Sequence, residues 1–86
     1  MPYIIGGTNM ANSVLVLAKD YRQYTGFLRH FKITKDQARY VKSYDHARGY
    51  DFNTLVFVLP NWWHSYTVGE YELFLARFKL VEVGEV

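Results

Sequence analysis

The sequence predicts an α/β fold with a small, mainly parallel four-stranded sheet and two main helices. The first observation is a repeated unit, in which an apolar run precedes a helix that ends in nearly the same residues. The run VLVLA at 14–18 precedes FLRHFKI at 27–33, and the run LVFVL at 55–59 precedes FLARFKL at 74–80. The second observation is that both runs are apolar at every position, which is typical of parallel strands covered on both faces. Two strand–helix–strand units in succession predict such a sheet.

The first unit predicts a strand over 13–18 and a helix over 21–32. Asp20 offers a side-chain oxygen to the free amides at the helix start, and Gln23 three residues later completes a capping signal. Apolar residues at helical spacing predict one buried face, made of Tyr24, Phe27, Leu28 and Phe31. Gly26 costs the helix about 1 kcal/mol relative to alanine, which indicates either close packing or tolerance of the loss at that point.

The rest of the chain predicts two more strands around the second unit. Residues 38–43 alternate weakly as a strand, and the connection 44–53 has room for a short helical turn. A third strand over 54–59 stops at Pro60, a helix over 68–79 follows, and 81–83 form the last strand. That helix begins with the capping pair Thr67 and Glu70, and its predicted buried face consists of Tyr71, Phe74, Leu75 and Phe78.

The character of the strands predicts their order in the sheet. The two wholly apolar strands belong in the centre, and the mixed strands at 38–43 and 81–83 belong at the edges. This gives the order 2-1-3-4 with right-handed crossovers, the arrangement of flavodoxin-like and Rossmann-like sheets. The connection 44–53 is hardly long enough for a helix, so we expect one face of the sheet to be thinly covered.

Composition predicts one domain over 13–86, preceded by an arm over 1–12 in which Gly6 and Gly7 break any regular element. The chain has no cysteine, which excludes a disulfide framework and fits a reducing compartment. No apolar stretch approaches the roughly 18 residues that span a bilayer. We therefore expect a cytoplasmic protein without a membrane partner.

The net charge of +2 combines a basic segment with an acidic one. Residues 19–48 carry eight of the ten Lys and Arg residues against three Asp, and residues 49–86 carry two against five acidic residues. A basic surface attracts nucleic acid or an acidic protein. A solvated helix face explains the same pattern, and we rank that interpretation higher.

Ligands of such sheets bind outside the carboxyl ends of the strands. The residues predicted at that edge are the binding candidates Lys19, Asp20, Tyr21, Arg22, Tyr44, Asp45, His46, Arg48, Asn61, Trp62, Trp63 and His64. No glycine follows the first strand, so the sequence lacks the glycine-rich phosphate loops of nucleotide sites, and we predict no cofactor. The histidines have neither metal-ligand spacing nor a third group to orient them, so we predict no metal and no catalytic residue.

Trp62 and Trp63 are the strongest functional lead, because two adjacent indoles cannot easily both point into a small core. One interpretation has both of them packing, one on the sheet edge and one on Tyr66. The other leaves one indole exposed as the anchor for a partner, because Trp, Tyr and Arg dominate interface hot spots. Stacking against a base is a further use of such aromatic side chains.

The segments SVLVLAKDYRQ, ARYVKS, HARGY and TLVFVLP resemble small uncharacterised proteins of tailed bacteriophages, especially those of actinobacteria. The matching positions are 14–18, 39–41, 48–49 and 55–60, roughly half the chain. Those proteins resemble a trimmed Rossmann or P-loop-type core without its phosphate loop. The resemblance implies a phage-encoded accessory protein in the host cytoplasm, and it transfers no catalytic residue.

We therefore predict a non-catalytic interaction module that binds a host or phage protein. The alternative is a nucleotide-binding or nucleic-acid-binding protein that uses the basic and aromatic residues at the carboxyl edge. A homodimer is a further expectation, on a par with a monomer. One possible contact is the last strand, an open sheet edge with Val81 and Val83. The other is the apolar arm at residues 3–5, which could cover that edge in its own chain or in a neighbouring one.

Overall fold

The structure is a computed structural model that describes residues 14–84. The predicted arm at 1–12 lies outside the described residues. The elements, in chain order, are β1 (Val14–Leu17), α1 (Tyr21–Phe31), β2 (Ala38–Tyr40), α2 (Tyr44–Ala47), β3 (Val56–Val58), the 3-10 helix η2 (Trp62–Ser65), α3 (Val68–Arg77) and β4 (Leu80–Glu82). The predicted short turn in the connection 44–53 is α2, whereas η2 was not predicted.

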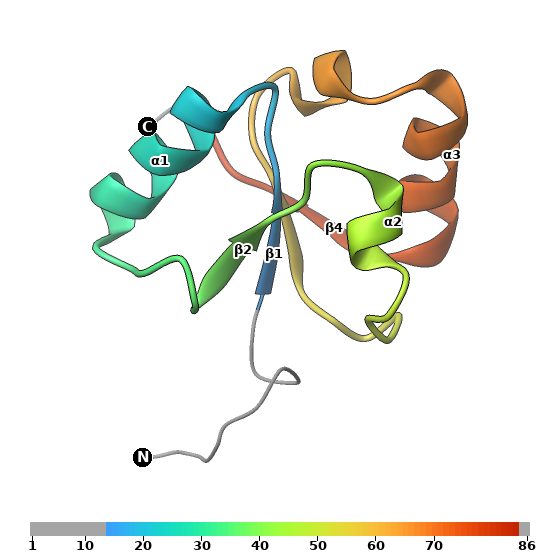
Figure 1. Ribbon diagram of the computed structural model, residues 1–86, viewed down its shortest axis with the longest axis horizontal. Helices are drawn as coiled ribbons and strands as arrows, with labels where there is room; N and C mark the ends of the chain where they lie inside the picture. The colour runs from blue at the N-terminus through green and yellow to red at the C-terminus, as the bar shows by residue number, and fades with distance from the viewer. Residues whose placement is uncertain (1–13, 85–86) are drawn as a thin grey trace.

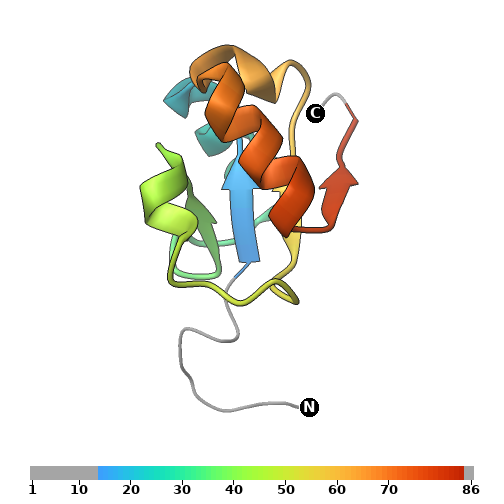
Figure 2. The ribbon, with the colours of Figure 1, turned by 90° about the vertical axis from the view of Figure 1, so that its right-hand side faces the viewer.

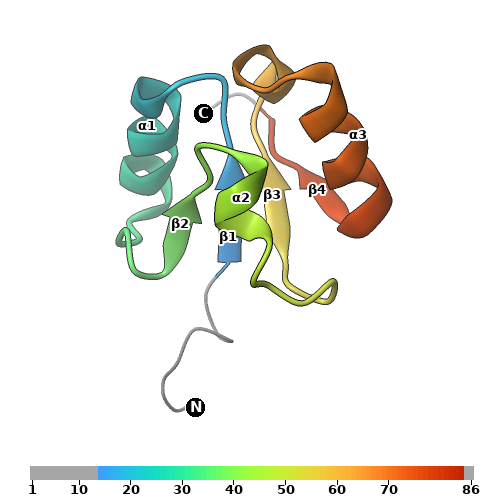
Figure 3. The same cartoon turned by 45° about the vertical axis from the view of Figure 1, so that its right-hand side comes forward.

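The four strands form one parallel sheet in the order β2-β1-β3-β4, which confirms the predicted order (Figure 3). Three of these strands are shorter than predicted, and β4 begins one residue earlier than predicted. Single backbone hydrogen bonds continue the pairing past the ends of β2 and β3. Val41 N donates to Val16 O at 3.1 Å, and Leu59 N donates to Leu17 O at 3.0 Å. Leu55 belongs to the predicted third strand but precedes β3, and its side chain is exposed.

Helices cover both faces of the sheet, so that the fold has three layers (Figure 1). The side chains of β1 alternate between the two faces: Leu15 and Leu17 enter the core under α2 and α3, whereas Val16 and Ala18, the residue after β1, enter the core under α1. The residues of β3 divide in the same way, with Val56 and Val58 on the α3 side and Phe57 on the α1 side. The central strands therefore hold two separate cores together.

Both helix starts are capped, in two different ways. The Thr67 hydroxyl accepts from Glu70 N at 3.1 Å and the Glu70 carboxylate accepts from Thr67 N at 3.0 Å, which confirms the capping box of α3. Asp20 caps α1 by accepting from Gln23 N at 2.8 Å. The Gln23 side chain accepts from Lys19 N instead of the cap residue itself, at 2.8 Å.

Two residues of the predicted buried faces are exposed. Phe31 is 48% exposed because it is the last residue of α1. Leu75 is 50% exposed because successive residues of a helix are about 100° apart, and Phe74 already occupies the direction of the core. Of the two explanations for Gly26, the structure favours tolerance, since no described atom outside the local helix backbone lies within 4 Å of where a Cβ would be.

The expectation of a thinly covered face is not met on the side of the sheet that the crossing from β2 to β3 passes. In Figure 1, α2 and α3 lie on the same side of the sheet, and α1 is the one helix of residues 14–84 on the other side. Arg77 of α3 holds α2 and its following turn by donating to Tyr44 Oη at 3.0 Å, Arg48 O at 2.9 Å and Tyr50 O at 2.7 Å. The Arg77 side chain thus holds in place the connection from β2 to β3, in which the only helix is the four-residue α2.

Among residues 14–84, no helix is long and apolar enough to cross a membrane.

Candidate functional site

The carboxyl ends of β1 and β3 lie side by side, and the loops after them turn to opposite faces of the sheet (Figure 3). This is the switch point at which ligands of doubly wound sheets bind. Lys19, Asp20 and Arg22 are exposed on the first loop and the start of α1, and Asn61 and His64 are exposed on the second. The structure therefore brings these two groups of predicted site residues to one edge.

The crevice between those loops is occupied by the protein's own side chains. The Gln23 amide donates to Pro60 O at 2.8 Å, which ties α1 to the loop after β3. The Ser65 hydroxyl donates to Ala18 O at 2.7 Å, and the Tyr66 hydroxyl donates to Val41 O. Three carbonyl groups at the strand ends, which would face a ligand in an open crevice, are thus already satisfied.

Burial raises the pKa of the Tyr66 hydroxyl far above its ordinary value of 10. The hydroxyl therefore stays protonated and remains a hydrogen-bond donor throughout the neutral range. Its hydrogen bond to Val41 O closes the edge next to β2.

The predicted group on α2 is only partly at this edge. His46 Nδ1 accepts from Lys42 N at 3.4 Å, and Tyr44 N donates to Glu70 Oε2 at 2.8 Å, so that the start of α2 lies near the start of α3. Arg48 lies at the other end of α2, next to Arg77 at the end of α3, where it forms an exposed ion pair with Asp45 at 3.1 Å. The structure thus separates Arg48 from the other basic candidates.

Tyr21 turns toward the β2 side of the molecule rather than toward the switch point. Its ring lies 5.6 Å from Tyr24 and 5.7 Å from Tyr40, and Lys35 Nζ lies 5.4 Å from the centre of the same ring. It is a separate feature from the aromatic residues after β3.

Trp62 and Trp63 lie on η2 and point in different directions. Pro60 ends the β3 segment, and Asn61 adopts a left-handed conformation with φ 62°, which turns the chain into η2. The Trp62 ring stacks on Tyr71 at 5.3 Å and contacts Phe74 at 6.0 Å, and only 5% of Trp62 is exposed. Trp63 is 46% exposed and meets Trp62 edge-to-face at 6.2 Å. One indole thus belongs to the core, and its neighbour stands on the surface.

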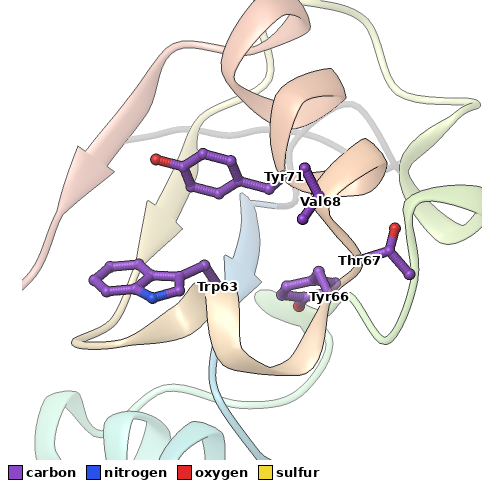
Figure 4. Close-up of a pocket in the computed structure, with 5 residues that line it drawn as sticks. All are labelled: Trp63, Tyr66, Thr67, Val68 and Tyr71. Atoms are coloured by element: carbon purple, nitrogen blue, oxygen red, sulfur yellow. The ribbon is translucent and has the colours of Figure 1, made fainter.

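Hollows lie on two sides of Trp63. The first hollow has a volume of about 220 Å³ and is lined by Trp63, Tyr66, Thr67, Val68 and Tyr71 (Figure 4). Figure 4 shows Trp63 and Tyr71 projecting side by side from η2 and α3. The second hollow, of about 390 Å³, lies between the end of β3 and the end of β4, and its lining includes Pro60, Trp62, Trp63, Glu82 and Val83.

The surface of α3 beside the first hollow is apolar. Val68 is 75% exposed, and Leu75, which lies two turns further along the same side of the helix, is half-exposed. We call Trp63, Val68, Tyr71 and Leu75 the Trp63 surface. Sequence reasoning found Trp63 but missed Val68 and Leu75, because the periodicity that marks a buried helix face gives no sign of a second apolar face.

Titratable side chains do not gather at the Trp63 surface. His64 lies at its border, with its ring 5.8 Å from that of Trp63. Between residues 14 and 84, no group of three His, Asp or Glu side chains is placed to hold a metal ion. The geometry at the Trp63 surface thus offers apolar contact and aromatic faces.

Comparisons with protein-family models, with curated proteins and with solved structures find no match to this chain.

Proposed function

We propose that this protein is a non-catalytic interaction module whose protein partner binds at the Trp63 surface. The observation that carries the proposal is the half-exposed Trp63 indole, held edge-to-face on a buried Trp62 and bordered by two hollows. A rigid, partly exposed tryptophan offers a large contact area at a small cost in side-chain entropy, which is the property of interface hot spots.

The filled switch point supports binding of a protein rather than of a nucleotide. A nucleotide at that edge would have to displace Gln23, Ser65 and Tyr66 from the carbonyl groups to which they donate. Each displacement would leave a carbonyl group in need of a new donor, at a cost of about 1–3 kcal/mol for a buried group. The Trp63 surface requires no such rearrangement.

The resemblance to small phage proteins supports a narrower proposal about biology. In that proposal the protein is a phage-encoded accessory factor in the host cytoplasm, and its partner is a host or phage protein. The partner's side of the contact is an apolar or aromatic side chain, because the first hollow is lined mainly by aromatic rings and Val68.

The test is capture of a partner from an actinobacterial lysate with the full chain, followed by affinity measurement with the purified partner. Trp63→Ala is expected to weaken binding at least 30-fold, the effect of losing a hot spot of about 2 kcal/mol. Phe52→Ala is the matched control, because Phe52 is a more exposed aromatic residue that lies outside the Trp63 surface. Equal affinity of the Trp63→Ala variant and the unaltered chain would refute the proposal.

A salt titration of the same preparation tests the alternative of nucleic-acid binding. Phosphate contacts make the logarithm of the binding constant fall steeply with the logarithm of the salt concentration. Binding of generic single-stranded DNA with such a slope, weakened by Lys19→Ala or Arg22→Ala and unaffected by Trp63→Ala, would favour the alternative. We expect no such binding at physiological salt, because Arg48 lies at the far end of α2 beside Arg77, which leaves Lys19 and Arg22 as the basic candidates at the edge.

A further inference from the structure

The two edge strands of the sheet differ in how their outer backbone groups are used. On the outer side of β2, Ala38 N donates to Thr34 O at 3.1 Å, and Ala38 O accepts from the buried Tyr24 hydroxyl at 2.6 Å. The Tyr24 ring also stacks on Tyr40 of the same strand at 4.9 Å. Helix α1 and the turn before β2 therefore protect this edge against pairing with another strand.

The outer edge of β4 has no such protection among the described residues. The backbone groups of Val81 and Val83 face β3, where Val83 N donates to Val58 O at 3.0 Å. In a parallel pair the alternate residues, Leu80 and Glu82, then point their N–H and C=O groups outward. Within residues 14–84 these outward groups have no hydrogen-bond partner. Figure 2 shows β4 as the outermost strand, with no described element beyond it.

We propose that β4 pairs with β4 of a second copy of the chain, antiparallel and about a two-fold axis at Val81. This register places Leu80 of each copy opposite Glu82 of the other. Residues that face each other in this way exchange both of their N–H···O=C hydrogen bonds. The outward groups of the two strands then satisfy one another completely.

The neighbouring registers are less favourable. An axis at Glu82 would place two carboxylates directly opposite each other, which destabilises a strand pair. An axis at Leu80 would place Phe78 opposite Glu82, although Phe78 N already donates to Phe74 O at 3.0 Å. The axis at Val81 avoids both problems.

The side chains of β4 also favour this pairing. Val81 is 36% exposed on the α1 side of the sheet, the side on which Val83 packs. At the axis the two copies of Val81 form a non-hydrogen-bonded pair, in which opposite side chains come closest, so that each covers the other. The strand follows Lys79 and ends at Glu82, so antiparallel pairing brings the basic start of each strand to the acidic end of the other. The edge is thus complementary to itself, as a two-fold interface requires.

Sedimentation equilibrium of the full chain tests the proposal, and we expect a dimer. Glu82→Pro removes an outward N–H group and leaves the bonds to β3 in place, a position at which edge strands accept proline. It should raise the dissociation constant of the dimer at least about tenfold, because each copy loses a hydrogen-bond donor. Glu82→Ala is the matched control, since it removes the same side chain but keeps the N–H group, and it should change the constant by less than about threefold.

Two results of this measurement would overturn the proposal. One is a full chain that stays monomeric over the whole concentration range, because the edge would then be open or covered by the chain itself. The other is a dimer that Glu82→Pro and Glu82→Ala affect equally, because that dimer would use another surface.

Disulfide trapping tests the register without a proline, and the natural chain has no cysteine that could interfere. Val81→Cys places a thiol at the axis, where the Cα atoms of such a pair are about 4.5 Å apart, within the range of disulfides. Lys79→Cys is the control, because Lys79 is exposed and lies on the same side of the strand as Val81. In the proposed register Lys79 lies opposite Val83 of the other copy, roughly 13 Å from its own counterpart.

The full-length variants are oxidised with oxidised glutathione and separated on non-reducing gels. A covalent dimer that forms from Val81→Cys at least about tenfold faster than from Lys79→Cys supports the pairing, because a fixed contact raises the effective thiol concentration. Equal rates, or no covalent dimer from either variant, would overturn it, because the two thiols at position 81 would then meet only by collision.

Discussion

Adjacent tryptophans on η2 have opposite roles, and their contribution to stability should differ accordingly. Trp62 fills the core between Tyr66, Tyr71 and Phe74, so Trp62→Ala should lower the free energy of unfolding by about 3–5 kcal/mol. Trp63→Ala removes a half-exposed ring that meets Trp62 edge-to-face, so its loss should be smaller, about 0.5–1.5 kcal/mol. Urea unfolding followed by circular dichroism measures both values. Comparable losses for the two variants would contradict the assignment of Trp63 to the surface.

The hydrogen bonds that fill the switch point should also be measurable in stability. Tyr66→Phe removes the donor to Val41 O and leaves a buried carbonyl group without it, so we expect a loss of about 1–3 kcal/mol. Tyr71→Phe is the matched control, because the Tyr71 hydroxyl has no hydrogen-bond partner among residues 14–84 and its ring has a similar place in the layer. A Tyr66→Phe variant as stable as the control would show that water replaces the lost donor.

Glu70 links protonation to stability at low pH. Hydrogen bonds from Thr67 N and Tyr44 N lower the pKa of the Glu70 carboxyl below its ordinary value of 4.5. A lowered folded-state pKa stabilises the fold at pH values above the unfolded-state pKa, and this contribution is lost as the pH falls through the folded-state value. Below about pH 4.5, Glu70→Gln should therefore lose less stability per pH unit than the unaltered chain.

Urea unfolding between pH 3 and pH 7 measures that slope for both proteins. Glu72→Gln supplies the control, because Glu72 is an exposed carboxylate on the same helix. If the two variants have the same slope, the bonds to Thr67 and Tyr44 do not hold the Glu70 charge.

At the scale of the elements, α1 contains a glycine that packing does not require. A methyl group at Gly26 would meet no described atom within 4 Å, and the backbone there is ordinary helix. Gly26→Ala should therefore raise the free energy of unfolding by about 0.5–1 kcal/mol. Thermal unfolding should show a higher midpoint, and a lower one would indicate that this face of α1 is held against something in the full chain.

The elements themselves were largely predictable because their signals are local. The strand order followed from the wholly apolar β1 and β3, and both caps were visible as a short polar side chain followed by a Glu or Gln. Phe31 and Leu75 were predicted wrongly, because the 3.6-residue period indicates which side of a helix is apolar but not how far the sheet extends beneath it. The hydrogen bonds of Arg77 to the turn after α2 join residues distant in sequence, so no local pattern indicated them.

The position of the candidate site could be predicted from the sequence, but whether its edge is open or filled by side chains could not. Parallel topology placed Lys19, Asn61 and Trp63 at one edge correctly, because strand ends in such a sheet lie together. Gln23 and Ser65 fill that edge by donating hydrogen bonds to Pro60 O and Ala18 O. The sequence marks Gln23 only as part of a helix cap and Ser65 only as a loop residue. Whether the edge is open or closed depends on tertiary contacts alone.

At the scale of the whole molecule, the two cores should unfold together. β1 and β3 contribute side chains to both, so neither side can lose its packing without loosening the strands of the other. Val16→Ala, a change on the α1 side only, should lower the urea midpoint equally by tryptophan fluorescence, which reports the α3 side, and by circular dichroism. Separate transitions for the two probes would show that the layers are independent.

During synthesis on the ribosome, β1 remains unpaired until its neighbours in the sheet have been made. β1 is synthesised before its neighbours in the sheet, which are residues 38–40 and 56–58. Its apolar side chains therefore emerge long before either neighbour exists, and the pairings that complete the centre of the sheet are non-local ones, which form slowly. A nascent chain stalled before residue 59 would present VLVL to the cell without its sheet, and this is the segment that a chaperone would be expected to hold.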